Sequence, residues 1–107
     1  MNKYRNQPTT VDGIRFASKA EARRYGELRL LEKAGEITHL ALQPRYHLHV
    51  YSGMSVRYKI GEYRADFLYH DGIASVVEDV KGTETALFKW KRKHFEAEYG
   101  IKLRVIK

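Results

Sequence analysis

Asp66 precedes a predicted tight turn, and Asp79 and Lys81 follow it. Two acids and a lysine at this spacing are typical of a metal-dependent hydrolytic site. The turn is Asp71-Gly72, and Asp-Gly between runs of β-branched and aromatic residues favours a hairpin. With those two residues alone in the loop, Asp79 and Lys81 share the face of Asp66. Asp66 and Asp79 are then diagonal neighbours about 7 Å apart, within reach of one cation. Because Mg²⁺ prefers oxygen ligands, the spacing predicts a magnesium-type site.

The pattern leaves two alternatives to this site open. A solvated sheet face would carry the same acids, with Lys81 as the salt-bridge partner of an aspartate. A three-residue loop would shift the strand by one residue and bring Glu78, rather than Asp79, to the face of Asp66.

Glu21 is a further acid with two open roles. The tetrapeptide SKAE at 18–21 fits a capping box, in which Ser18 caps a helix and Glu21 reaches back to a free amide. Glu21 also heads an apolar stripe with Tyr25 and Leu28 at helical spacing, and this stripe should face the sheet. A carboxylate in that position needs a partner, so Glu21 is either a helix cap or a further metal ligand.

Helical and extended patterns alternate around these residues. The strand, helix and strand that follow the turn imply a right-handed crossover and a parallel pairing. We therefore expect an α/β protein with an αβββαβ core, a mixed sheet flanked by helices. The expected elements are a helix from Ser18 to Gly35, strands over 36–42, 45–51 and 54–60, the hairpin over 63–82, a helix from Thr85 to Tyr99 and a strand over 101–106.

Composition limits the partners and the compartment. The chain has 107 residues, enough for one domain over 1–107, in which 1–10 are expected to form a flexible basic arm. Lys and Arg total 20 against 13 Asp and Glu, and the net charge of +7 favours a polyanionic partner such as DNA. Cysteine is absent, and no apolar run has the length of a membrane span or the pattern of a signal peptide. A cytoplasmic protein with neither thiolate metal sites nor a membrane partner is expected.

Basic residues of the second predicted helix are candidates for phosphate contacts because they begin only a few residues beyond Lys81. Leu87 and Trp90 of the same helix are expected in the core, with base stacking on Trp90 or Tyr63 as the alternative. The predicted nucleic-acid-binding residues are Lys89, Lys91, Arg92 and Lys93 of this helix, together with Lys3 and Arg5 of the N-terminal arm.

Five segments together resemble a known family. FASKAEARRYGELRLLEKAGEI, LQPRY, YRADF, VVEDVKG and the basic aromatic helix after them look like small phage-encoded, Holliday-junction-resolvase-like endonucleases of the PD-(D/E)XK superfamily. The likeness covers nearly the whole chain. Asp66 stands for the first acid of the motif and Asp79-Val80-Lys81 for the second part, while Ala65 occupies a position where proline is common.

The resemblance implies a restriction-endonuclease-like fold and a metal cofactor. Mg²⁺, for which Mn²⁺ can substitute, would be held by Asp66, Asp79, the Val80 carbonyl and an acid of the first helix, for which Glu21 is the match. Lys81 would position the attacking water or stabilise developing charge.

The expected function is therefore metal-dependent hydrolysis of DNA phosphodiesters by an endonuclease. Branched or recombination intermediates are the expected substrate, cut in pairs by a homodimer, in the host cytoplasm if the protein is phage-encoded. Two alternatives stay open. One is a non-catalytic basic nucleic-acid-binding accessory protein with a nuclease-like fold, and the other is a nicking nuclease subunit that is active only with a partner.

Overall fold

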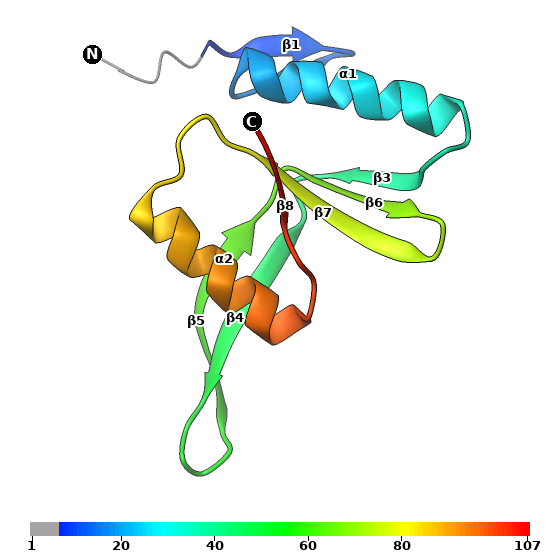
Figure 1. Cartoon of the computed structure of the whole chain (residues 1–107). Helices are drawn as coiled ribbons and strands as arrows, with labels where there is room; N and C mark the ends of the chain where they lie inside the picture. The colour runs from blue at the N-terminus through cyan, green and yellow to red at the C-terminus, as the bar shows by residue number, and fades with distance from the viewer. Residues whose placement is uncertain (1–6) are drawn as a thin grey trace.

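The computed structural model describes residues 7–107, so the predicted phosphate contacts of Lys3 and Arg5 lie outside the described residues. This part of the chain is a mixed α/β structure (Figure 1). Its elements are β1 (Thr9–Val11), β2 (Ile14–Phe16), α1 (Lys19–Lys33), β3 (Thr38–Leu42), β4 (Arg45–Tyr51), β5 (Arg57–Arg64), β6 (Phe67–Asp71), β7 (Ala74–Val80), α2 (Ala86–Tyr99) and β8 (Arg104–Ile106).

A mixed sheet with the strand order β3-β6-β7-β8 lies at the centre of the molecule. β6 pairs antiparallel with both β3 and β7, whereas β8 pairs parallel with β7. The connection from β7 to β8 runs through α2, so the predicted parallel pairing is confirmed. None of the helices in residues 7–107 is long and apolar enough to cross a membrane.

A sharp bend joins this sheet to a second pair of strands. At the bend the Gln43 N–H donates to the Asp66 carbonyl at 2.9 Å, and the Ala65 N–H donates to the Pro44 carbonyl at 3.1 Å. β3 therefore continues into β4, and β5 into β6, as one long ribbon. Gln43 has a φ of 51°, a left-handed conformation that few side chains adopt. Beyond the bend, β4 and β5 with their connecting loop, residues 45–64, project from the molecule, and we call this segment the arm (Figure 1).

Two apolar cores lie on the two sides of the central sheet. α1 and the β1–β2 hairpin cover one face, where Tyr25 and Leu28 pack on Phe67. α2 fills the angle between the arm and the other face, where Phe88 and Phe95 are buried. The bend thus gives α2 two surfaces to pack on, although only a narrow stripe of the helix is buried.

Both predicted helices begin at their predicted caps. The Ser18 hydroxyl accepts a hydrogen bond from the Glu21 N–H at 3.1 Å, and the Thr85 hydroxyl accepts one from the Phe88 N–H at 3.1 Å. Gly100, with a φ of 67°, ends α2 in the left-handed conformation that favours glycine.

Two predictions about the ends and faces of elements were wrong. Thr9 and Thr10 pair with β2, so the flexible N-terminal segment predicted over 1–10 was too long. Leu87 and Trp90 are 60% and 74% exposed rather than in the core. Their position on α2 points toward the open side of the arm, and no tertiary partner in the described chain covers them.

Candidate functional site

The central hairpin brings Asp66 and Asp79 together, but in a different register from the predicted one. Asp71 pairs with Ala74, so Gly72 and Ile73 form the loop, and each residue of one strand lies opposite a residue two positions away from its predicted partner. The displacement is even, so Asp79 rather than Glu78 still faces Asp66. The predicted diagonal arrangement was therefore wrong, and the two carboxyl groups lie close enough for each to shift the pKa of the other.

Burial raises the pKa of both acids, and Asp66 adds to the rise at Asp79. Asp79 is 2% exposed, and burial together with the neighbouring Asp66 raises its pKa to about 7. Burial also raises the pKa of Asp66, although its Oδ2 accepts a hydrogen bond from the Val80 N–H at 2.7 Å. Two acids in such a pair retain a proton near neutral pH unless a cation replaces it.

Tyr63 and Lys81 hold Asp79 from two sides. The Tyr63 hydroxyl donates a hydrogen bond to Asp79 Oδ2 within the core. The Lys81 ammonium lies 3.6 Å from Asp79 Oδ1 and 4.9 Å from the centre of the Phe88 ring. Sequence reasoning considered Tyr63 only as a stacking platform. Its role depends on the bend between β5 and β6, because the bend directs Tyr63 of β5 toward Asp79 of β7.

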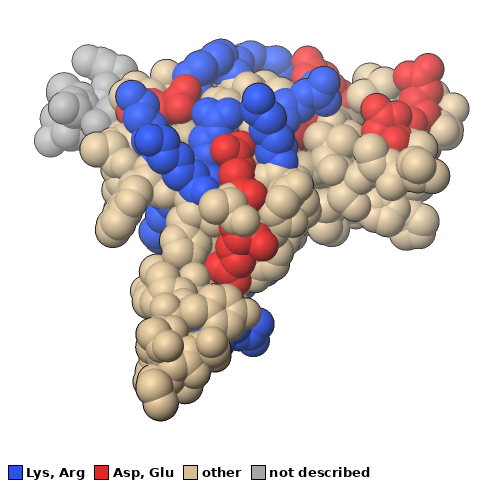
Figure 2. All heavy atoms as spheres, turned by 60° about the horizontal axis from the view of Figure 1, so that its bottom comes forward, with Lys and Arg blue, Asp and Glu red and all other residues tan. Residues whose placement is uncertain are grey.

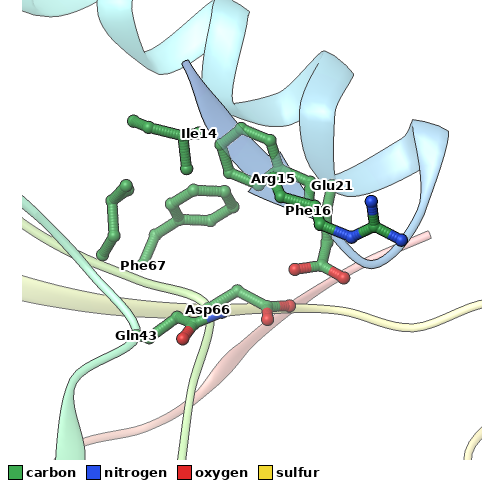
Figure 3. Close-up of a pocket in the computed structure, with 8 residues that line it drawn as sticks. Ile14, Arg15, Phe16, Glu21, Gln43, Asp66 and Phe67 are labelled. Atoms are coloured by element: carbon green, nitrogen blue, oxygen red, sulfur yellow. The ribbon is translucent and has the colours of Figure 1, made fainter. Parts of the chain in front are cut away.

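Glu21 joins the site from α1. Its N–H is capped by Ser18, whereas its carboxylate points toward that of Asp66 (Figure 3) and contributes to the raised pKa of Asp66. Arg15 of β2 lines the same pocket as Glu21 (Figure 3), a placement that the sequence did not predict. A pocket of about 260 Å³ adjoins these groups and is lined by Ile14, Arg15, Phe16, Glu21, Leu42, Gln43, Asp66 and Phe67.

Glu78, the alternative to Asp79, lies on the opposite face of β7. It is fully buried, and Arg24 of α1 donates to its two carboxylate oxygens at 2.8 and 2.7 Å. The Tyr69 hydroxyl also donates to it, and the Arg104 guanidinium is 3.6 Å away. Burial alone would raise the pKa of Glu78, but these donors outweigh it and lower the pKa. The placement of Glu78 in the site is therefore wrong.

The donor set at this bend suits a hard divalent cation. Asp66, Asp79 and Glu21 offer only carboxylate oxygens, as Mg²⁺ and Mn²⁺ prefer. Within residues 7–107, no three His, Asp or Glu side chains stand close enough together to hold an ion as they are. The Val80 N–H also reaches this group of acids, since it donates a hydrogen bond to Asp66 Oδ2.

The basic residues of α2 divide into two pairs. Lys91 donates to the Glu62 carbonyl at 3.1 Å, and Arg92 lies 3.4 Å from Glu96 and 3.8 Å from Glu84. Lys89 and Lys93 are exposed, and neither forms an ion pair with another described residue. Figure 2 shows Lys and Arg side chains gathered above the arm, with acidic groups among them. Only Lys89 and Lys93 of the four remain open to a phosphate.

Replacing Tyr63 with Phe is expected to weaken divalent-metal affinity by about 10- to 100-fold, because the hydrogen bond that orients Asp79 is lost. Calorimetric titration with Mn²⁺ measures the effect. Tyr69→Phe is the matched control, since it removes a hydroxyl from Glu78 on the other face and should lower stability without changing metal affinity. Equal affinity in Tyr63→Phe and the original chain would show that this hydroxyl only fills the core.

Comparison with known proteins gives a family but no activity. The sequence matches, over residues 1–107, the family described as protein of unknown function (DUF1064). No curated protein matches the chain, and no solved structure does.

Proposed function

Because the chain belongs to the DUF1064 family, whose function is unknown, we propose its activity from the site alone: it is a metal-dependent endonuclease that hydrolyses DNA phosphodiesters. One observation carries this proposal. Asp66, Asp79 and Glu21 converge from separate elements beside Lys81, and burial together with Asp66 raises the pKa of Asp79 to about 7. A strongly perturbed acidic cluster next to a pocket is a typical signature of a catalytic site.

The residues of this cluster would divide the work between them. Asp66, Asp79 and Glu21, with the Val80 carbonyl as a further ligand, would hold Mg²⁺, which when bound polarises a phosphate and acidifies a water. Lys81 would donate to the attacking water or to the charge that develops on the phosphate. The contacts of Lys81 with Phe88 and Asp79 keep its ammonium group at the site before any substrate arrives.

The order of elements supports a restriction-endonuclease-like core. α1 precedes the antiparallel strands β3, β6 and β7, and α2 then crosses to the parallel strand β8. Asp66 lies at the bend before β6, and Asp79 and Lys81 lie at the end of β7. This placement agrees with the resemblance drawn from the sequence.

Branched DNA is the substrate that we propose. Residues 7–107 bring together one such cluster of acids, and a nuclease that makes two coordinated cuts needs two. A homodimer supplies them most simply.

Incubation of the purified protein with Mg²⁺ and linear, nicked, single-stranded or four-way DNA tests the activity directly. We expect cleavage that EDTA abolishes and Mn²⁺ restores, with four-way DNA cut fastest. Binding of DNA without cleavage under any of these metals would instead favour the accessory-protein alternative. Cleavage that appears only after cell extract is added would favour a subunit that needs a partner.

Lys89→Ala and Lys93→Ala are each expected to weaken DNA binding without regard to sequence. Each removes one exposed cation, so the slope of log affinity against log salt should become shallower by about 0.9. Fluorescence anisotropy over a salt series measures this slope. Lys33→Ala, an exposed lysine at the end of α1, is the control and should leave the slope unchanged. Identical slopes in all variants would remove α2 from the DNA interface.

A further inference from the structure

An apolar surface covers the side of the arm that faces α2. Val50 and Tyr58 are cross-strand partners on the arm and are 41% and 55% exposed, and Ile60 beside them is 56% exposed. Leu87 and Trp90 of α2 continue this surface with 60% and 74% exposure. On the side in view in Figure 2, few charged groups lie on the projecting arm, although β5 also carries Arg57, Lys59 and Glu62. Contiguous exposed apolar area of this kind marks interaction surfaces in soluble proteins.

A groove crosses this surface where the arm meets α2. Its volume is about 230 Å³, and it is lined by Leu48, Ile60, Gly61, Leu87, Trp90, Lys91 and His94. Gly61 leaves the groove open, since a Cβ built on it would meet no atom within 4 Å. The groove is therefore a ready receptor for an apolar side chain.

The tip of the same arm carries side chains that would fit such a receptor. Tyr51, Met54 and Val56 are 69%, 85% and 47% exposed. A two-stranded hairpin is marginal in water without further packing, and the outer part of this arm has no packing partner among residues 7–107. The groove and the apolar side chains that could fill it thus belong to the same chain.

We propose that a second copy of this chain covers the surface, with the arm tip of each copy seated in the groove of the other about a twofold axis. A twofold contact of this kind satisfies tip and groove simultaneously in both copies. Of the eight exposed apolar side chains, the three aromatic ones present roughly 300–500 Å² per copy at ~150–250 Å² for a whole aromatic side chain, and the five aliphatic ones add to this area. A stable interface needs roughly 800 Å² per partner.

The chemistry of the surface favours a second copy over nucleic acid. Phosphate binding requires cations, but Lys91 at the groove is already bonded to the Glu62 carbonyl. The exposed Lys89 and Lys93 therefore remain for DNA. The interface itself does not depend on the nuclease proposal, whereas the pairing of two cutting sites by this dimer rests on it.

Solution mass tests the interface. By light scattering after gel filtration at tens of micromolar, the chain should be a dimer, and Met54→Asp or Gly61→Leu should shift it to a monomer with unchanged circular dichroism. Ile73→Asp and Leu30→Asp are matched controls, because Ile73 and Leu30 are 106% and 69% exposed away from the arm. A monomeric original chain, or controls that dissociate equally, would overturn the proposal.

Crosslinking tests the arrangement within the dimer. The chain has no cysteine, so Met54→Cys and Leu87→Cys each introduce a single thiol. A short bismaleimide should link the two variants when they are mixed and link neither variant alone. Links only between two copies of the Met54→Cys variant, or no links, would exclude the tip-in-groove contact. Because neither readout requires cleavage, a dimer without nuclease activity would contradict the proposed function and leave this interface standing.

Discussion

Asp79→Asn is expected to reduce DNA cleavage by at least about 10²- to 10³-fold while DNA affinity stays within a factor of a few. The change preserves the shape of the side chain and leaves an oxygen to accept the Tyr63 hydrogen bond, so the fold should persist. It removes the charge that would hold the metal beside Lys81. Cleavage rates under single-turnover conditions and binding by anisotropy measure the two effects separately.

Asp71→Asn is the control for charge, because Asp71 is exposed at the far end of the same hairpin. It should cut DNA at the original rate. Original rates in Asp79→Asn as well would remove this acid from the reaction and with it the proposed site.

The difference in stability between the original chain and Asp79→Asn should depend on pH, because Asp79 has a raised pKa in the folded state. The pKa of Asp79 is about 7 in the fold and about 3.9 in an unfolded chain, so the folded state binds the extra proton between these values. Stability is therefore lost as pH rises through this window. Without metal at pH 8, Asp79→Asn should melt at a higher temperature than the original chain, and near pH 4 the difference should vanish. Mg²⁺ should raise the melting temperature of the original chain only. A variant that is less stable at pH 8 would contradict the raised pKa.

The sequence predicts this fold where the signals are local. Helical spacing and the caps Ser18 and Thr85 define both helices, and the glycine of the Asp71-Gly72 pair marks the central turn. The register could not be taken from that pair alone. Gly72 has a φ of 66° and occupies the first loop position, an arrangement typical of a type II′ turn, whereas Asp-Gly is typical of type I′. The two turn types differ little in local conformational preference, so the packing of the strands decides between them.

The parts of the site that could not be predicted depend on contacts between distant segments. Tyr63 reaches Asp79 only because the ribbon bends at Gln43 and Asp66, and no periodicity in the sequence marks that bend. The same bend leaves Trp90 exposed, since α2 packs into its angle along a narrow stripe. Predictions from residue spacing assume straight strands, and these residues lie where the strands are not straight.

The second large effect is a loss of stability, expected when the buried partner of Glu78 is removed. Glu78 and Asp79 are neighbours in β7, yet Arg24 binds both carboxylate oxygens of Glu78 on the α1 face, whereas the pKa of Asp79 on the other face is raised to about 7. Arg24→Ala would leave the fully buried Glu78 carboxylate without its bidentate partner. Removing one member of a buried pair typically costs about 3–5 kcal/mol, a large part of the stability of a chain this size. Urea unfolding at pH 7 should show a loss of about 3 kcal/mol.

Two further variants separate this cost from general damage to α1. Arg29→Ala removes a partly exposed pair with Glu32 on the same helix and should cost much less stability than Arg24→Ala. Adding Glu78→Gln to Arg24→Ala removes the stranded charge but keeps an acceptor for Tyr69, and should recover part of the loss.

The pH dependence of this pair is opposite to that of Asp79. The pKa of Glu78 is lowered in the fold, so its contribution to stability is fully present above about 4.3, the pKa of an unfolded glutamate, and is lost as pH falls through the folded value. The destabilisation caused by Arg24→Ala should therefore be large at pH 7 and shrink in acid. An equal loss at pH 7 and pH 3 would mean that Arg24 supports α1 by packing alone and that Glu78 is not the charge it neutralises.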